Sequence, residues 1–228
     1  MGADATIYEQ IDKNITSEFA GYDTLTLEMP ITALTTEDEV ADALTDGQTG
    51  AVIVAKTPFY ATMGGQVGDK GVITAGDAVF EVKDTINVVG NRIAHIGTVT
   101  KGMIKVGDNA VLSVDPVNRA KTCKNHSATH LMQRALREVL GTHVQQKGSY
   151  QDNERTRFDF SHFEAMTAEE LAKVEQIVND KIAENIQVET NVMTMDEAKQ
   201  TGAMALFDEK YGEKVRVVSM GDFSKEFC

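Results

Sequence analysis

The stretch DPVNRAKTCKNHSATHLMQRALREVLG, residues 115–141, separates two parts of the chain that differ in character. Proline directly after Asp115 is typical of a helix start, because proline is easily accommodated in the first helical turn. We expect the helix to continue to about Leu140, with Gly141 as its C-terminal cap. The residues before it read as short strands, and those after it as helices alternating with strands. The sequence therefore predicts a β-rich part followed by an α+β part.

Residues 21–115 are short apolar or alternating runs, broken by turn signals such as Asp46-Gly47 and Gly76-Asp77. Several short strands at this spacing predict a small β-barrel. The segment Thr36–Leu44 fits either a short helix or a strand with a loop. Residues 1–20 show weak periodicity, so we expect a linker or the tail of a preceding helix. The expected strands are Thr24–Met29, Ala51–Lys56, Ala78–Val89, Arg92–Val99 and Ala110–Val114.

Residues 116–228 are predicted to form helices that alternate with strands. Thr167-Ala168-Glu169-Glu170 reads as a capping box at the start of a second helix. Its apolar positions have the helical spacing of a buried stripe, namely Leu171, Val174, Val178 and Ile182. The other expected elements are a hairpin of His143–Gln151 with Arg155–Ser161, strands at Val188–Met195 and Lys214–Ser219, and a short helix at Asp196–Thr201.

Net charge, cysteine count and the lack of an apolar span limit the classes of protein to which the chain can belong. The 228 residues carry a net charge of −13, which argues against general nucleic-acid affinity, including affinity for DNA. Neither a signal peptide nor a membrane span is evident, and two cysteines are too few for a disulfide framework, so we expect a cytoplasmic protein. The window 119–160 nevertheless has a local charge of +4 and leaves −17 for the remainder. It is either a chance cluster on solvated faces or a surface that faces phosphates.

Two histidines, His126 and His130, stand four residues apart, so one helix face can offer both imidazoles to a metal ion. The metalloprotease motif needs glutamate directly after the first histidine, and Ser127 excludes it. Cys228 is a distant thiolate that can join the pair, whereas Cys123 reads as a small, partly buried helix residue. Zinc usually takes four ligands, and the chain supplies three good candidates.

Two further segments have residues that suit a binding site. Gly64 and Gly65 precede Gln66, and adjacent glycines allow either a tight turn or close approach of the backbone to a ligand. In the alternating segment after the metal helix, Val144 and Gln146 project to the same side. The Gln146 amide can orient a carbonyl group or a water, or can simply be exposed.

Three longer motifs resemble the editing region of bacterial alanyl-tRNA synthetases. They are NHSATHLMQRALREVLGTHVQQKGS (125–149), RFDFSHFEAM (157–166) and GAMALFDEKYGEKVRVVSMGDFSKEFC (202–228). The resemblance begins near FAGYD (19–23), includes TPFY (57–60) and GGQVGDKG (64–71), and covers about nine-tenths of the chain. Free-standing alanyl-tRNA editing proteins share the core motifs.

The resemblance implies a zinc-associated hydrolase site. It assigns His126, His130 and Cys228 as zinc ligands, with a fourth ligand, a histidine, expected just beyond this sequence, so that zinc would be held weakly here or not at all. It assigns Thr129 and Gln146 to the editing pocket, with Gly64, Gly65 and Gln66 at its border. We expect the cations Lys147, Arg155 and Arg157 to contact acceptor-end phosphates. The family commonly has an acidic and a small residue where this chain has Thr62 and Met63, so no role is assigned there.

The resemblance also implies the fold and the activity. The expected fold class is α+β: a linker (1–20), a small β-barrel (21–115), and an α+β editing domain (116–228) with helices packed on an antiparallel sheet. The expected activity is hydrolysis of Ser-tRNA(Ala) and Gly-tRNA(Ala) within a synthetase that ligates alanine to tRNA(Ala) with ATP and Mg²⁺. The expected partners are the acceptor end of tRNA(Ala) and the rest of the synthetase chain. No association with a membrane is expected. The alternatives are a tRNA-binding module with structural zinc, or a free-standing trans-editing protein.

Overall fold

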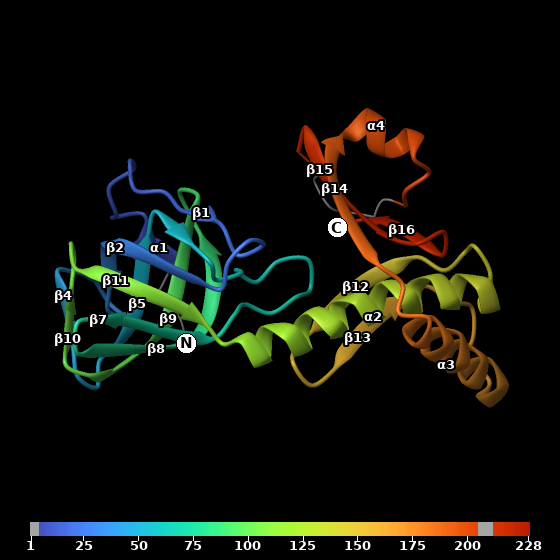
Figure 1. The fold of residues 1–228 in the computed structure, drawn as a ribbon, viewed down its shortest axis with the longest axis horizontal. Coiled ribbons are helices and arrows are strands. Elements are labelled where there is room, and N and C mark those ends of the chain that lie inside the picture. The colour runs from blue at the N-terminus through green and yellow to red at the C-terminus, as the bar shows by residue number, and fades with distance from the viewer. Residues whose placement is uncertain (1–4, 205–211) are drawn as a thin grey trace. The chain divides into compact units, whose positions relative to one another are not determined.

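The computed structural model describes residues 5–204 and 212–228. The chain divides into two compact units, Met1–Thr122 and Cys123–Cys228. Part of the expected C-terminal motif, residues 205–211, lies outside the described residues, as do the first four residues of the expected linker. The expected fold class, an N-terminal barrel followed by an α+β part, is confirmed (Figure 1).

The first unit is built on a closed antiparallel barrel. Its strands follow the order β11-β7-β8-β9-β5-β2, and β2 pairs back onto β11 to complete the ring. Closure removes the free edges that an open sheet would expose. The strands are β2 (Thr26–Thr35), β5 (Thr49–Val54), β7 (Gly71–Ala75), β8 (Ala78–Val88), β9 (Arg92–Lys101) and β11 (Asn109–Val114).

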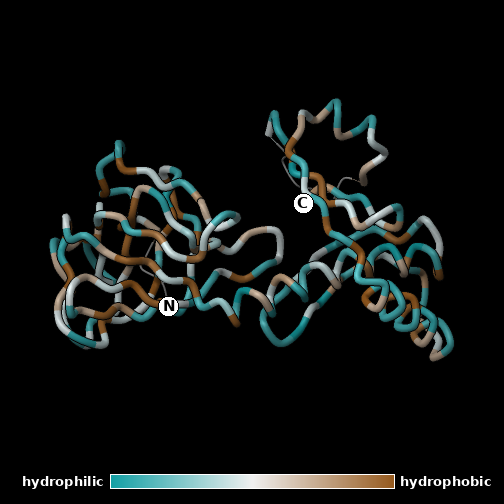
Figure 2. The backbone as a smooth tube through the Cα atoms, viewed as in Figure 1, coloured by the Kyte–Doolittle hydropathy of each residue, from teal (hydrophilic) through white to brown (hydrophobic). Residues whose placement is uncertain are grey.

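Strand β5 is buried on both faces, which explains its continuous apolar run. Val52 and Val54 contribute to the barrel core, whereas Ala51 and Ile53 belong to a second cluster on the other face. That second cluster includes residues from the N-terminal segment, which contains α1 (Ala5–Tyr8). Brown, apolar stretches run among the barrel strands in Figure 2, interspersed with teal and white ones. Residues of the expected linker therefore pack on the barrel.

Short strands complete the first unit. They are β1 (Glu18–Phe19), which pairs in parallel with β6 (Lys56–Thr57), β3 (Val40–Ala41), which pairs antiparallel with the end of β2, and β4 (Ala43–Thr45), which pairs with β10 (Met103–Lys105). The segment Thr36–Leu44 is thus the strand-with-loop alternative, and it contains no helix.

Helix α2 (Pro116–Leu140) has the predicted ends. The Asp115 carboxylate accepts hydrogen bonds from the backbone N–H groups of Val117 and Asn118, both at 3.0 Å, and so caps the first turn. At the other end Gly141 has φ +120°, and its N–H donates to the carbonyl of Arg137. A side chain is rarely tolerated at that φ, which is why glycine ends the helix.

The second unit packs α2 against the hairpin β12 (Gln146–Gln151) and β13 (Thr156–Phe160) and against α3 (Ala168–Ala183). The capping box at Thr167 is present as predicted. The predicted buried stripe of α3 is wrong at both ends, because Leu171 and Ile182 are more than half exposed. The apolar residues of the helix that pack into the core with α2 and the hairpin are the central ones, Val174, Ile177 and Val178.

A three-stranded antiparallel sheet, in the order β14-β15-β16, completes the second unit. Its strands are β14 (Val188–Thr194), β15 (Lys214–Met220) and β16 (Ser224–Phe227), with the short helix α4 (Met195–Gln200) after β14. Leu131 of α2 packs with Val218 and Met220 of β15, so α2 and this sheet share a hydrophobic core. Among the described residues, no helix is long and apolar enough to cross a membrane.

Candidate metal centre

Three side chains of the second unit meet as a potential metal site. His126 and His130 lie on one face of α2 with their rings stacked at 5.1 Å between centroids. Cys228 follows β16, and its backbone N–H donates to the carbonyl of Arg216 on β15. The ligand atoms of the three residues all lie within 4.8 Å of one another. The sheet thus brings the last residue of the chain to the histidine pair.

The spacing of these atoms suits a tetrahedral ion. The Cys228 Sγ is 3.5 Å from Nε2 of His126. Zinc–nitrogen and zinc–sulfur bonds of about 2.0 and 2.3 Å at the tetrahedral angle separate the two ligand atoms by about 3.5 Å. Two imidazole nitrogens and one thiolate are also a donor set that zinc commonly takes. The residues present therefore fit a zinc ion in both chemistry and spacing.

The electrostatics of the group favour a thiolate beside an imidazolium. Burial raises the pKa of the Cys228 thiol, but hydrogen bonds from His126 and His130 outweigh it and bring that pKa to about 6. Burial likewise lowers the pKa of His130, but hydrogen bonds and negative charge from Cys228 and Glu226 raise it to about 9. The sulfur is therefore in its metal-binding form at neutral pH, and a metal ion would replace the His130 proton.

Glu226 is a member of this group that the sequence reasoning missed. Its side chain is buried, and one carboxylate oxygen is hydrogen-bonded to Nδ1 of His130. The available signal was its position two residues before Cys228, because alternate residues of a strand share a face. A lone glutamate in an SKEFC segment does not by itself indicate burial, so the contact emerges only from the fold.

Thr129 is buried on α2 between the two histidines in sequence. Its hydroxyl donates to the carbonyl of Asn125 at 2.9 Å and is also hydrogen-bonded to the hydroxyl of Thr156 on β13. Thr156 was not among the predicted residues. Because a hydroxyl has one proton and two lone pairs, donation to Asn125 makes Thr156 the donor in the second bond. One acceptor position then remains on Thr129.

Gln146 begins β12, where it pairs with Phe160, and a bulge follows it before Gly148. It is partly buried, and its amide makes no hydrogen bond to any residue that the structure describes. The hairpin that carries Gln146 also carries Thr156, which contacts Thr129. Gln146 therefore belongs to the hairpin that packs beside α2, and its amide is available to a ligand.

The predicted phosphate-binding cations are exposed on the same hairpin. Arg155 and Arg157 lie over the ring of Tyr150, at 5.8 and 6.0 Å from its centroid. Arg155 directly precedes β13, and Arg157 lies on it between Thr156 and Phe158, which face α2 and the core. Arg155 and Arg157 therefore lie on the outer face of the hairpin, and Lys147 on β12 is exposed as well.

The glycine loop belongs to the first unit. Gly64 and Gly65 have φ of +60° and +83°, and Met63 and Gln66 exchange backbone hydrogen bonds across them. Two consecutive residues with positive φ, flanked by a hydrogen-bonded pair, form a tight hairpin turn, and glycine adopts positive φ without strain. The side chain of Gln66 is buried beneath this turn.

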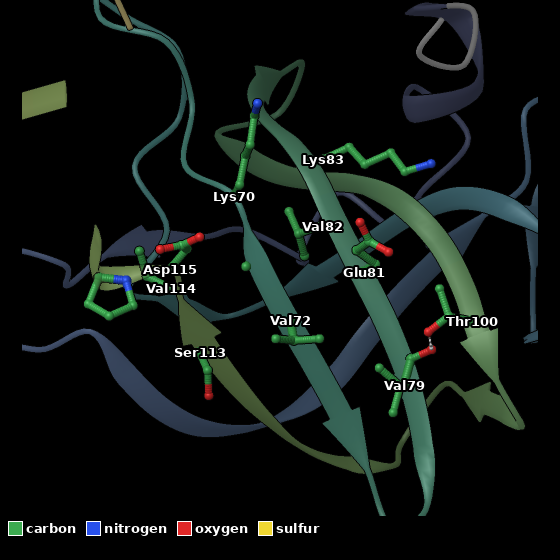
Figure 3. A pocket seen from close by; sticks show the side chains of 12 residues that line it. Lys70, Val72, Val79, Glu81, Val82, Lys83, Thr100, Ser113, Val114 and Asp115 are labelled. Carbon is green, nitrogen blue, oxygen red and sulfur yellow. Dashed lines mark hydrogen bonds between the residues drawn. The ribbon is translucent and has the colours of Figure 1, made fainter. Parts of the chain in front are cut away.

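A surface groove of the first unit is shown in Figure 3. It lies over β7 and β8 and is lined at its ends by charged side chains, among them Lys70, Lys83 and Asp115. All its residues come from the barrel and the start of α2, so it is separate in sequence from the metal group.

Comparison with known proteins places the chain in a family. The sequence pattern described as tRNA synthetases class II (A) matches residues 2–118, just over half of the chain. The chain therefore belongs to the class II tRNA synthetases. It is 58% identical over 228 residues to Alanine--tRNA ligase 1 of Lachnoclostridium phytofermentans, a match that covers 100% of this chain and 26% of that protein. The resemblance to alanyl-tRNA synthetases is thereby confirmed, and the chain spans about a quarter of the curated relative's length.

Proposed function

We propose that the chain is the editing region of an alanyl-tRNA synthetase and hydrolyses the ester bond of Ser-tRNA(Ala) and Gly-tRNA(Ala). The observation that carries this proposal is the convergence of His126, His130 and Cys228 on one potential metal site. Thr129, next to His130 on α2, is hydrogen-bonded to Thr156 of the hairpin. The similarity to an alanine--tRNA ligase along the whole chain favours a synthetase over a free-standing trans-editing protein.

The chemistry of alanine selection explains the need for such a site. Serine differs from alanine by one hydroxyl and glycine by one methyl group. A single pocket discriminates poorly between such close analogues, so a second, hydrolytic site is the usual solution. In this scheme the synthetase ligates alanine to tRNA(Ala) in the cytoplasm with ATP and Mg²⁺ in a separate domain, and the present region removes the errors.

Zinc is the ion that the donor set fits. His126 and His130 would bind it through ring nitrogens and Cys228 through its thiolate. When bound, such an ion can hold the aminoacyl group or polarise its ester and the attacking water.

The remaining residues bind and orient the substrate. The free acceptor position of the Thr129 hydroxyl can accept a hydrogen bond from the hydroxyl of a serine ester. The Gln146 amide orients the ester carbonyl or the water. Lys147, Arg155 and Arg157 offer positive charge to the acceptor-end phosphates. The loop of Gly64, Gly65 and Gln66 permits a close approach of the backbone to the terminal adenosine.

The test is deacylation of Ser-tRNA(Ala), Gly-tRNA(Ala) and Ala-tRNA(Ala), each with zinc supplied. Both the 228-residue chain and a full-length synthetase that contains it should be assayed. We expect hydrolysis of the first two substrates and sparing of the third. His126→Ala should reduce the rate roughly 100-fold, as the loss of one electrostatic contact in a site does. His162→Ala, which changes a histidine outside the metal group, is the matched control. No hydrolysis by the zinc-loaded full-length protein would contradict the proposal.

A second candidate is a tRNA-binding module in which the metal only joins β16 to α2. The observation in its favour is that Cys228 lies 102 positions after His126 in sequence, so an ion bound by both would tie the sheet to the helix. Structural zinc contributes directly to folding energy. Thermal unfolding with and without a chelator, measured beside deacylation, separates the two roles: a stability change without hydrolysis supports this one.

A further inference from the structure

A buried carboxylate next to the metal group has no role in the scheme above. Glu226 is only 1% exposed, although a buried charge is costly unless it is paired. Replacing a buried ion pair by apolar residues is often neutral or stabilising, so stability alone does not explain a glutamate here. Its presence points to a function that needs the carboxylate itself.

The contacts of Glu226 define what it does. One oxygen is hydrogen-bonded to Nδ1 of His130, and the other lies 3.4 Å from the hydroxyl of Ser224. Nδ1 is the ring nitrogen that faces this carboxylate, and a carboxylate oxygen accepts the hydrogen bond from an imidazole N–H, so the contact favours a proton on Nδ1 of His130. Nε2 is then the nitrogen that His130 can offer to an ion shared with Cys228 and His126.

The backbone of Glu226 is fixed on both sides. It pairs with Val218 of β15 on one side and forms a bridge with Met204 on the other. The N–H of Phe227 donates to the carbonyl of Met204 at 2.9 Å, and the N–H of Met204 donates to the carbonyl of Lys225 at 3.0 Å. A carboxylate on so constrained a strand can hold the imidazole ring in one orientation.

We infer that Glu226 is a positioning residue of the metal centre: it holds His130 in the Nδ1–H tautomer and aims Nε2 at the ion. This inference rests on the proposed metal centre. Carboxylate–histidine–metal arrangements fix the ring and increase the basicity of the ligand, and their loss typically weakens metal binding by about 10–100-fold. Because Glu226 and Cys228 belong to one strand end, the same segment supplies a ligand and the group that orients another.

The first experiment measures metal affinity in the 228-residue chain. Co²⁺ and Zn²⁺ are titrated in competition with a chelator into the wild type, Glu226→Gln and Glu189→Gln. Glu189 is an exposed glutamate of β14 in the same sheet, so its variant repeats the chemical change away from His130. We expect Glu226→Gln to bind both ions about 10–100-fold more weakly and with an altered Co²⁺ visible spectrum. Glu189→Gln should match the wild type.

The outcomes separate the two proposals. A wild type that binds neither ion, alone or in the full-length synthetase, overturns the metal centre itself. A wild type that binds, with a Glu226→Gln variant of equal affinity and spectrum, overturns only the role of Glu226. A second measurement needs no variant: nitrogen chemical shifts of labelled histidine in the zinc-loaded wild type. A proton on Nδ1 of His130 with zinc at Nε2 supports the inference, and the reverse assignment overturns it even if Glu226→Gln does not fold.

Discussion

The thiol of Cys228 lies 3.5 Å from Nε2 of His126, although 102 positions separate the two residues in the chain. The helix supplies the histidines, and the end of the sheet supplies the sulfur. Between these elements, Leu131 of α2 packs with Val218 of β15. The hydrophobic contact between helix and sheet therefore sets the distance across which a metal ion can bind.

The two cysteines offer a matched test of this arrangement. We expect Cys228→Ser to reduce zinc affinity by at least tenfold, because a hydroxyl is a far poorer ligand than a thiolate. Cys123→Ser changes an exposed cysteine of the same helix and should leave zinc affinity unchanged. Zinc content after dialysis and a chelator titration provide the measurement. Equal zinc retention by the two variants would remove Cys228 from the ligand set.

The hydrogen bond between Thr129 and Thr156 predicts a selective effect on serine. Thr129→Val removes the hydroxyl that we propose accepts a hydrogen bond from the serine ester. Because one hydrogen bond is then lost on serine only, we expect Ser-tRNA(Ala) deacylation to fall roughly tenfold more than Gly-tRNA(Ala) deacylation. Thr122→Val is the control, because the Thr122 hydroxyl makes the same bond to a carbonyl four residues earlier on α2. A uniform loss on both substrates would count against recognition of the hydroxyl.

Gln146 is expected to affect catalysis without affecting the fold. Its amide has no hydrogen-bond partner among the described residues, so a change there breaks no side-chain hydrogen bond within that part of the chain. Gln146→His should lower deacylation roughly tenfold or more, because it displaces the group that we propose orients the ester or water. The melting temperature should not change. Gln145→His, at the neighbouring position, is the comparison. If Gln146→His retained full activity, Gln146 would have no part in the mechanism.

The sequence predicted the elements of this site better than their contacts. The helix ends at Pro116, Gly141 and Thr167 could be predicted from local sequence, because each of these residues acts within one turn of its helix. All three have the expected role. The α3 stripe was wrong at Leu171 and Ile182 because helical spacing gives the direction of a face but not how far neighbouring elements cover it.

The contacts of the site depend on long-range packing. Glu226 and Thr156 reach His130 and Thr129 across 96 and 27 positions, and no local pattern distinguishes them from exposed polar residues. The histidine pair was recognisable because i, i+4 spacing is itself a local rule. Its partner Cys228 was recognisable from the motif, whereas the orienting carboxylate required the sheet register.

The buried ion pair between Arg119 and Asp69 predicts a large stability loss on substitution. The Arg119 guanidinium binds the Asp69 carboxylate and also donates to the carbonyls of Gly21 and Pro58, at 2.9 and 2.8 Å. Asp69→Asn leaves a buried cation poorly compensated, and we expect a loss of about 3 kcal/mol in unfolding free energy. Asp77→Asn, at an exposed turn, should be neutral. Urea unfolding provides the measurement, and a neutral Asp69→Asn would show that the pair does not stabilise the barrel.

His95 predicts how the stability of the barrel depends on pH. Its Nδ1 is 2.7 Å from the carbonyl of Val52, and its Nε2 is 2.7 Å from the hydroxyl of Thr57. Complete burial lowers the pKa of His95 from 6.5 to about 4, against the opposing effect of the bond to Val52. The folded state therefore holds the neutral ring at a pH where the unfolded chain takes up a proton.

The sign of the effect follows from this difference. Above pH 6.5 the ring is neutral in both states, and its contribution to stability is fully present. As the pH falls from 6.5 towards 4, only the unfolded chain gains the proton, so stability decreases. From this residue alone we expect about 2 kcal/mol less unfolding free energy at pH 5 than at pH 7. His95→Gln, which cannot titrate, should be less stable at pH 7 but should lose correspondingly less on acidification. Urea unfolding of both proteins at the two pH values measures this difference, and identical pH dependence of the two would show that His95 is not the group that titrates.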